Sequence, residues 1–264
     1  MRAISARLFL AGLIVATSAC SSSPEPTTSL SAPDTAGELS LVRDLRPENG
    51  VPVFLGVANR KRNREDEEAV AVQHIAQQAS RYLRTSAIYQ HVSQRGSQGV
   101  GYLDDITTHW DEKLAAELTE SVDILTSTRT DTGTLVTARV TSLPAAPDVH
   151  HIDPGGTAGP APAWVAGTPE VPGYLVAVGT AQQRRTLRDT IDFTDQEALK
   201  AILIQRGSTL RMVEDRRSVE SRGTIGSVTR AEEAQATLSG FLVVARYATS
   251  DGRYHYSLAI AREE

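Results

Sequence analysis

The sequence predicts an α+β fold of two tandem strand–helix–strand–strand modules, each with one helix packed on a small, mainly antiparallel sheet. Three observations predict it: an apolar segment ending in Gly-x-Ala occurs twice, a helical pattern follows each copy, and each half ends in two strand-like segments around a turn. A stretch rich in proline and glycine, residues 143–160, separates the halves. We therefore expect a first module over residues 39–142 and a second over residues 161–264.

The repeated apolar segment predicts the first strand of each module. Residues 51–58 have the sequence Val-Pro-Val-Phe-Leu-Gly-Val-Ala, and residues 171–181 contain a similar run that ends in Gly-Thr-Ala. Short apolar runs bounded by turn residues are typical of buried strands. Each segment is therefore expected in the core of its module.

A helix is predicted after each of these strands. In the first half, over residues 65–85, small apolar residues recur at gaps of three and four and form a narrow stripe: Ala69, Val72, Ala76, Ala79 and Leu83. In the second half, Thr194 to Glu197 has the pattern of a capping box, which predicts a helix that begins there and runs through Ile204. Its apolar face could extend to Leu210 and Val213. A further short helix is expected over residues 110–118.

Each half is predicted to end in a β-hairpin. Residues 238–247 and 253–261 flank the turn-forming pair Asp251-Gly252, and the alternation in the second of these strands predicts one buried face and one wetter face. A matching hairpin is expected over residues 121–140. The two hairpins align at a constant separation along the chain, although chance similarity of β-rich segments is the alternative explanation.

The first 19 residues have the features of a lipoprotein signal peptide. Arg2 and Arg7 precede an apolar run, residues 8–16, which is too short to span a bilayer because spanning takes roughly 20 residues. Small residues then lead to Ala19 and Cys20, as in a lipobox, although the position of Thr17 is more often leucine.

Cys20 is the only cysteine in the chain, so no disulfide can form within it. We expect cleavage between Ala19 and Cys20 and attachment of diacylglyceryl and palmitate groups to Cys20, which anchor a protein when two or three acyl chains are present. Ordinary signal cleavage after Ala19 with an incidental cysteine is the alternative. Residues 20–38 are rich in Ser, Thr, Pro and Ala, and predict a flexible tether. Ser21 favours transfer to the outer membrane, with the modules facing the periplasm.

Composition argues against nucleic acid as a partner and against a cofactor. The chain has a formal charge of −5 and no basic stripe with interleaved aromatic residues. His150, His151 and Asp153 could ligate a metal, but neighbouring residues in a Pro/Gly segment rarely converge on one ion. No metal or other cofactor is therefore expected.

Other candidate sites have simpler explanations. The acidic run Glu65 to Glu68 is explained by the helix dipole and is expected in solvent. The glycine-rich stretch 95–101 lacks the Gly-Lys-Ser/Thr ending of a P-loop and is interpreted as a flexible loop. No nucleophile-elbow signature is present. The remaining polar candidates are scattered histidines with surface or satisfied interior roles expected: His74, His91, His109 and His255. We predict no catalytic residues and no enzymatic activity.

Residues 162–262 resemble the Lpp-twenty family of bacterial lipoproteins. The resemblance rests on Pro162-Ala163-Trp164, the strand at 174–181, an alanine-rich helix and the hairpin around Asp251-Gly252. It implies a FlgP-like strand–helix–strand–strand module on a lipid anchor, of which the first half is a more diverged copy, and it implies no catalytic residues. The sequence departs from the family in having two modules and an insertion over residues 182–193. Trp164 is expected to pack in the core.

Together these features predict a lipid-anchored envelope lipoprotein with a structural or assembly role. It would contact the membrane through acylated Cys20 and other proteins through its modules, as a homo-oligomer or in a larger envelope assembly. The alternative is a periplasmic binding module for a small ligand or a cell-wall glycan. A hydrolase would require a buried polar cluster between the modules.

Overall fold

A computed structural model describes residues 44–96, 99–155, 160–206, 211–217 and 227–263 of the chain. The elements of the first module are β1 (Val53–Asn59), α2 (Glu65–Leu83), β2 (Thr85–Gly96), β3 (Gly99–His109), α3 (Glu112–Leu118), η1 (Thr119–Ser121), β4 (Val122–Arg129) and β5 (Gly133–Val140). Those of the second are α4 (Ala163–Ala166), β6 (Tyr174–Gln182), α5 (Leu187–Gln205), β7 (Arg211–Arg217), β8 (Ser227–Leu238), β9 (Leu242–Ala248) and β10 (Tyr254–Arg262).

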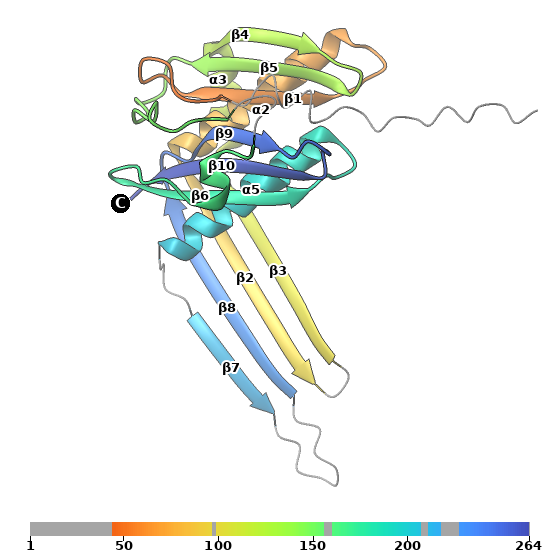
Figure 1. The fold of residues 1–264 in the computed structure, drawn as a ribbon, viewed down its shortest axis with the longest axis vertical. Coiled ribbons are helices and arrows are strands. Elements are labelled where there is room, and N and C mark those ends of the chain that lie inside the picture. Colours follow the sequence, from red (N-terminus) through yellow and green to blue (C-terminus); the bar gives the residue numbers. More distant parts are fainter. Residues whose placement is uncertain (1–43, 97–98, 156–159, 207–210, 218–226, 264) are drawn as a thin grey trace, which may run out of the picture. The chain divides into compact units, whose positions relative to one another are not determined.

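The predicted α+β class, with helices packed on small antiparallel sheets, is confirmed. The first module has a three-stranded antiparallel sheet of order β1-β5-β4, and the second has one of order β6-β10-β9 (Figure 1). Helix α2 packs on the first sheet and α5 on the second. Both modules belong to one compact unit, residues 33–264.

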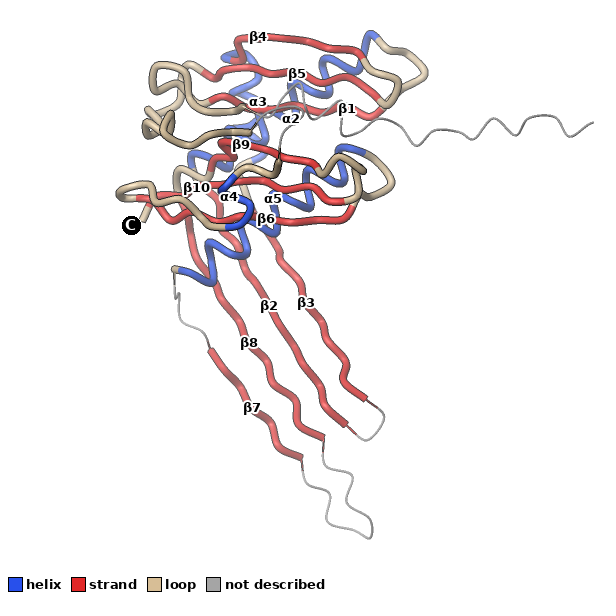
Figure 2. The backbone as a smooth tube through the Cα atoms, viewed as in Figure 1, coloured by secondary structure: helices blue, strands red, loops and turns tan. Residues whose placement is uncertain are grey.

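Each module has two strands more than the sequence pattern indicated, between its helix and its hairpin. These strands form a four-stranded antiparallel sheet of order β3-β2-β8-β7 (Figure 2). Its central pair joins the modules, because β2 runs against β8 from Thr85 opposite Leu238 to Arg95 opposite Val228. The stretch 95–101 was expected to be a flexible loop. Apart from residues 97–98, which lie outside the described residues, it belongs to the ends of β2 and β3.

Close approach of helix to sheet explains the glycine in both Gly-x-Ala segments. A Cβ atom placed on Gly56 would lie 2.1 Å from the carbonyl oxygen of Ala71 in α2. One placed on Gly179 would lie 2.0 Å from the carbonyl oxygen of Thr194 in α5. Any larger residue would push the helix off the strand, so these glycines set the helix–sheet distance in both modules.

The first helix forms where predicted, but its buried face differs from the predicted stripe. Ala76 and Ala79 are buried as expected, whereas Ala69 is exposed. The buried face is centred on Ala71 and Ile75, which are fully buried between the helix and its sheet. The short helix predicted at 110–118 is present as α3.

The second helix begins earlier than predicted. Its N-cap is Thr186, whose side chain accepts a hydrogen bond from the Asp189 backbone N–H at 3.1 Å. Thr194 lies inside the helix, where its hydroxyl donates to the Thr190 carbonyl, so the predicted capping box is wrong. Residues 187–193 are the first turns of α5 and not part of an inserted loop. The helix also ends before Val213, which lies in β7; Leu210 lies outside the described residues.

Both predicted hairpins are present as β4–β5 and β9–β10. In β10, however, residues of both orientations are buried, including Ser257, Leu258, Ala259 and Ile260. The predicted wetter face is wrong because β10 is the central strand of its sheet, with α5 on one face and other chain segments on the other.

One of those segments is the proline- and glycine-rich stretch between the modules. Its described residues form no helix or strand, as predicted, yet Val149 and Ile152 are buried in the same apolar cluster as Trp164 and Leu258. The guanidinium of Arg46 donates to the carbonyl of Ile152 at 3.0 Å. The segment is therefore part of the core as well as a connection, and the predicted burial of Trp164 is confirmed.

Candidate functional site: the junction between the modules

A buried histidine connects the two modules. His74 of α2 accepts a hydrogen bond at Nδ1 from the Val57 backbone N–H at 3.1 Å. Its Nε2 lies 2.9 Å from Oδ1 of Asp192 in α5, and its side chain is only 3 % exposed. Because Nδ1 accepts, this network assigns the imidazole proton to Nε2, from which it is donated to Asp192. One imidazole thus joins β1, α2 and α5.

Electrostatics keep this pair as a neutral imidazole beside an ionised carboxylate. Burial lowers the pKa of His74, and the opposing effect of the Asp192 hydrogen bond and charge does not offset it. Burial alone would raise the pKa of Asp192, but the hydrogen bond from His74 and nearby positive charge lower it to about 2. The pair can therefore hold the modules together at neutral pH without charging the histidine.

Two arginines complete the junction. Arg188 lies 3.4 Å from Asp192 through Nε and donates through Nη1 to the Val57 carbonyl at 3.2 Å, so it also bridges the modules. The Arg81 guanidinium lies 4.1 Å from the centroid of the Trp110 ring. Burial lowers the pKa of Arg81, and the negative charges in α5 act in the opposite direction.

A second buried polar cluster lies beneath α5. Arg246 of β9 makes two hydrogen bonds to the Asp195 carboxylate, at 2.7 and 2.8 Å. Ser257 of β10 donates to Asp195 at 2.8 Å and accepts from Arg246 at 2.7 Å. All three residues are buried. The Ser257 hydroxyl is thus held by a carboxylate and a guanidinium, an arrangement that gives it no imidazole base.

The cavity beside these clusters is too small for a substrate. It measures about 10 Å³ and is lined by residues of both modules: Phe54, Gln78, Arg81, Asp195, Phe241, Leu242 and Val243. A single water needs roughly this volume. The buried polar cluster that a hydrolase would require is present, but its geometry favours a structural role at the junction.

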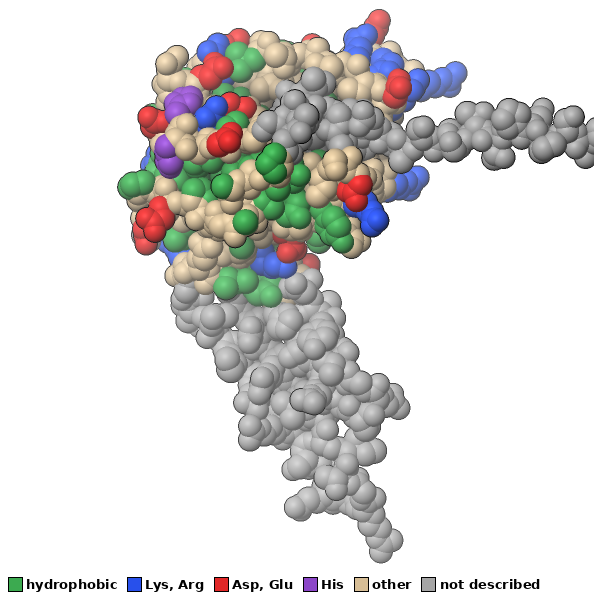
Figure 3. Space-filling view, viewed as in Figure 1, with side chains coloured by type: hydrophobic (Ala, Val, Ile, Leu, Met, Phe, Trp, Pro, Cys, Tyr) green, Lys and Arg blue, Asp and Glu red, His purple; other side chains and the backbone are tan. Residues whose placement is uncertain are grey.

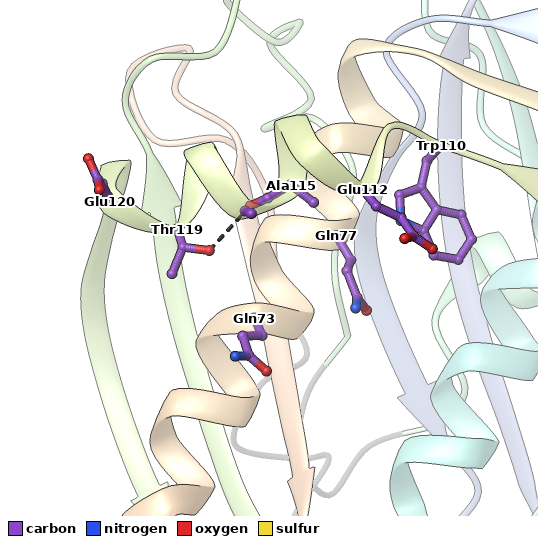
Figure 4. A pocket seen from close by; sticks show the side chains of 8 residues that line it. Gln73, Gln77, Trp110, Glu112, Ala115, Thr119 and Glu120 are labelled. Atoms are coloured by element: carbon purple, nitrogen blue, oxygen red, sulfur yellow. Dashed lines mark hydrogen bonds between the residues drawn. The ribbon is translucent and has the colours of Figure 1, made fainter.

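A larger cavity of about 640 Å³ lies between α2 and α3 (Figure 4). Gln73 and Gln77 of α2 line it from one side, and Trp110 and Glu112 lie near the start of α3. The buried indole N–H of Trp110 has no protein acceptor. Amides, a carboxylate and an aromatic ring can bind a polar ligand such as a sugar.

The predicted lipidation site lies outside the described residues. This holds for Ala19, Cys20 and the tether up to residue 38. No helix in the described ranges has the length and apolar character needed to cross a bilayer.

The histidines of the connecting segment make local contacts. His151 Nε2 lies 3.3 Å from the Glu170 carbonyl oxygen, and Asp153 accepts from the Gly155 backbone N–H at 2.9 Å. Within the part of the chain that the structure describes, no group of three or more His, Cys, Asp or Glu side chains could hold a metal ion.

The acidic run at the start of α2 is not wholly in solvent, which corrects the prediction for Glu67. This carboxylate is fully buried and accepts hydrogen bonds from the Lys61 backbone at 2.9 Å and from the Thr134 hydroxyl at 2.7 Å. Burial would raise the pKa of Glu67, but these bonds and Arg64 lower it. Glu67 thereby ties the start of α2 to β5. Glu65 is exposed as expected.

The other histidines lie apart from the junction. His255 is buried, with Nε2 3.0 Å from the Gly252 carbonyl oxygen, and burial lowers its pKa. His109 is exposed. The side chain of His91 lies outside the described side chains. The exposed position of His109 matches its predicted surface role. His255 is in the interior as predicted, but only its Nε2 is satisfied, because its buried Nδ1 has no partner among the described residues.

One sequence signal could have revealed the second cluster. Arg246 is the only charged residue in the run Phe241–Ala248, which otherwise has the composition of a buried strand. A charged side chain there requires a buried partner. The partner itself, Asp195, was hidden by the capping-box interpretation of its helix.

The described surface carries charges of both signs. Figure 3 shows Lys and Arg interspersed with Asp and Glu on the face in view, which gives no basic stripe there for nucleic acid. Comparisons with protein-family models, with curated proteins and with solved structures find no match to this chain, and the resemblance to the Lpp-twenty family stays a prediction from its sequence.

Proposed function

We propose that this chain is a lipid-anchored envelope lipoprotein with a structural or assembly role, and not an enzyme. In this proposal Cys20 carries the acyl groups, residues 20–38 form the tether, and the two Lpp-twenty-like modules make protein contacts at the outer membrane on its periplasmic side.

The observation that carries the proposal is the open edge of the first sheet. Among the described residues, strand β4 pairs with β5 alone. Most residues of β4 are exposed, and Ile124 is 41 % exposed. Unpaired strand edges bind other proteins by strand addition, and natural monomers usually protect them. The contacts of His74 and Arg188 support the same reading, since they link the two modules, and the cavity beside them is too small for a substrate.

Metabolic labelling tests the anchor. Cells producing the full chain would be grown with a clickable palmitate analogue and fractionated, with Cys20→Ser as the matched variant. The proposal expects label and outer-membrane fractionation for the native chain and loss of both for Cys20→Ser. Label that survives in Cys20→Ser, or a native chain found only in the soluble fraction, would contradict it.

The cavity between α2 and α3 favours a second candidate function, binding of a cell-wall glycan or another small polar ligand. Thermal melting of the protein would be measured with a panel of muropeptides, and then with the Gln77→Ala variant. A ligand-dependent rise in Tm that Gln77→Ala removes would support this candidate. Unchanged melting with every muropeptide would count against a glycan.

A further inference from the structure

The two modules are arranged head to tail, so that the equivalent strands occur in the same order across both modules. Chain order makes β2 equivalent to β7 and β3 equivalent to β8, so the order β3-β2-β8-β7 consists of one pair followed by its copy. The two three-stranded sheets are arranged in the same way. Strand β1 lies beside β9 in Figure 1, and residues of both strands line the small junction cavity. The sequence of strands is therefore β4-β5-β1 followed by its equivalent, β9-β10-β6.

Local geometry identifies equivalent residues in the two modules. Before the first strand, the isolated bridge of Glu48 with Val51 has its counterpart in that of Val171 with Tyr174. Gly56 and Gly179 make the same close approach to their helices. In the hairpins the register is interrupted at Leu125 in β4 and at Val244 in β9, so these residues are also equivalent.

These pairs show that the separation between equivalent residues shortens along the chain. The constant separation predicted from the hairpins places Val136 against Tyr256, whereas the register opposite Gly56 and Gly179 matches Val136 with Ser257. A shift of one residue reverses the face of a strand, so the structural alignment replaces the sequence alignment.

A repeat in one direction leaves complementary surfaces at its two ends. Inside the chain, the junction pairs β2 with β8. At the ends of the four-stranded sheet, β7 and β3 have no strand on their outer sides in the described structure, and they are the equivalents of β2 and β8. The outer edge of β7 in one chain can therefore pair with β3 of another in the way that β2 pairs with β8.

Equivalent strands are buried at the junction and exposed at the ends of the chain's repeat. Strand β9, at the junction, is buried throughout, whereas its equivalent β4 is mostly exposed. Strand β1 is buried except at its last residue, whereas its equivalent β6 is partly exposed. Each surface that is buried at the junction therefore has an equivalent surface, on the other module, that is exposed at one end of the repeat.

Two exposed isoleucines fit this arrangement. Ile124, 41 % exposed, is equivalent to Val243, and Ile204, 45 % exposed, is equivalent to Arg81. Val243 and Arg81 line the junction cavity together from opposite modules. In a repeated junction, Ile204 of one chain would meet Ile124 of the next, and both would leave water.

We infer that a second copy of this chain docks head to tail, with β6 and β7 of one copy against β4 and β3 of the next. This inference rests on the proposed assembly role and names its partner. Such an interface is heterologous, so each added copy presents the same free end and assembly can continue beyond a dimer.

The contact between copies is weaker than the junction within a chain. The positions equivalent to His74 and Asp192 are Glu197 and Ala69, which cannot form the histidine–carboxylate pair. Assembly is accordingly reversible and depends on concentration.

Disulfide trapping in native membranes tests the inference. Within the chain, Asp44 forms an antiparallel bridge with Ala245, and the equivalent positions are Gly167 and Thr126, both exposed. Residues bridged in this way have Cα atoms ~4.5–5.5 Å apart, within the range of a disulfide. The full lipoprotein carrying Gly167→Cys and Thr126→Cys would be oxidised in membranes and separated without reductant. Native Cys20 is the only other cysteine.

The inference expects a ladder of dimers, trimers and higher species from the double variant, and at most dimers from either single variant. Adding Ile124→Lys should remove the ladder, whereas Tyr254→Lys, a matched change at the third exposed large apolar residue, should leave it. The Asp44→Cys/Ala245→Cys pair, which should close within one chain, verifies the oxidation.

Monomers alone from the double variant, with the internal control oxidised, would overturn the inference. The proposed function is judged separately, since acylation and membrane fractionation of the same samples do not depend on the ladder. Labelled, membrane-bound monomers would refute the head-to-tail docking and leave the anchor intact, whereas a ladder from unlabelled soluble protein would refute the anchor and support the docking.

Discussion

At the scale of single residues, the described core contains charged and polar groups that are paired through most of their atoms, while Nε of Arg246 and Nδ1 of His255 are buried without a hydrogen-bond partner among the described residues. His74 stays neutral between a backbone N–H and Asp192, and Arg246 forms a buried ion pair with Asp195. Burying such groups costs free energy, and hydrogen bonds to buried partners offset this cost. Removing one member should therefore be much more harmful than losing an ion pair at the surface.

Stability should fall as the pH drops below about 6.5, the ordinary histidine pKa. The folded pKa of His74 lies below its unfolded value, so only the unfolded chain takes up this proton, at a cost of up to ~1.4 kcal/mol per pH unit until the folded pKa is reached. Urea unfolding from pH 7.5 to 5.0 measures this. The loss should be smaller in His74→Gln, while exposed His109→Gln should match the native chain; an unchanged slope in His74→Gln would refute it.

Below about pH 4 the loss should continue because of Asp192. Its pKa of about 2 in the folded chain lies below the ordinary value of 3.8, so this stabilisation is present above pH 3.8 and lost as the pH falls towards 2. Since the side chain is 36 % exposed, screening limits the effect to about 1 kcal/mol. Unfolding of Asp192→Asn at pH 4.5 and 2.5 should show a smaller difference than the native chain does.

Replacing Arg246 by Met should destabilise the fold by ~3–5 kcal/mol, because Asp195 would be buried without its partner. Arg253→Met is the matched control: its partner is Asp251, and both side chains are largely exposed, so its urea midpoint should stay close to that of the native chain. Urea midpoints of both variants measure the difference. Equal midpoints would show that the buried pair does not stabilise the module.

At the scale of elements, the sequence predicted the helices and hairpins that depend on interactions between residues close together in the chain. Helix α2, the short helix α3 and both hairpins follow from apolar periodicity and turn residues. The start of α5 was missed because Thr194 to Glu197 imitates a cap, whereas Thr186 provides it. Strands β2, β3, β7 and β8 were missed because their pairing joins distant parts of the chain. The buried roles of His74 and Glu67 likewise depend on partners from other elements.

The two close-packing glycines should tolerate no side chain. Gly179→Ala would place a Cβ 2.0 Å from a helix carbonyl oxygen, and Gly56→Ala would do so at 2.1 Å. Overpacking of this kind costs ~1–3 kcal/mol or more. Gly167→Ala is the control, because nothing lies within 4 Å of its Cβ position. Thermal unfolding should show a large loss of Tm for the first two and almost none for the third.

At the scale of the whole molecule, the order of strands has the largest consequence. A chain that repeats its module in one direction buries one junction between the modules. At its two ends it exposes surfaces equivalent to the two that are buried at that junction. The duplication was visible in the sequence, but its direction was not, since direction depends on which strands pair across the modules. On a membrane, acylated copies would be held at high local concentration, which compensates for a weak contact.

Mixing two end-blocked variants tests the head-to-tail account most directly. Ile124→Lys should block one end and Ile204→Lys the other, so each detergent-solubilised variant should remain monomeric in sedimentation velocity. Mixed together, they should form a dimer of one copy of each and nothing larger, because the free end of one meets the free end of the other. Monomers that persist in the mixture, or a single variant that still forms long assemblies, would contradict the account.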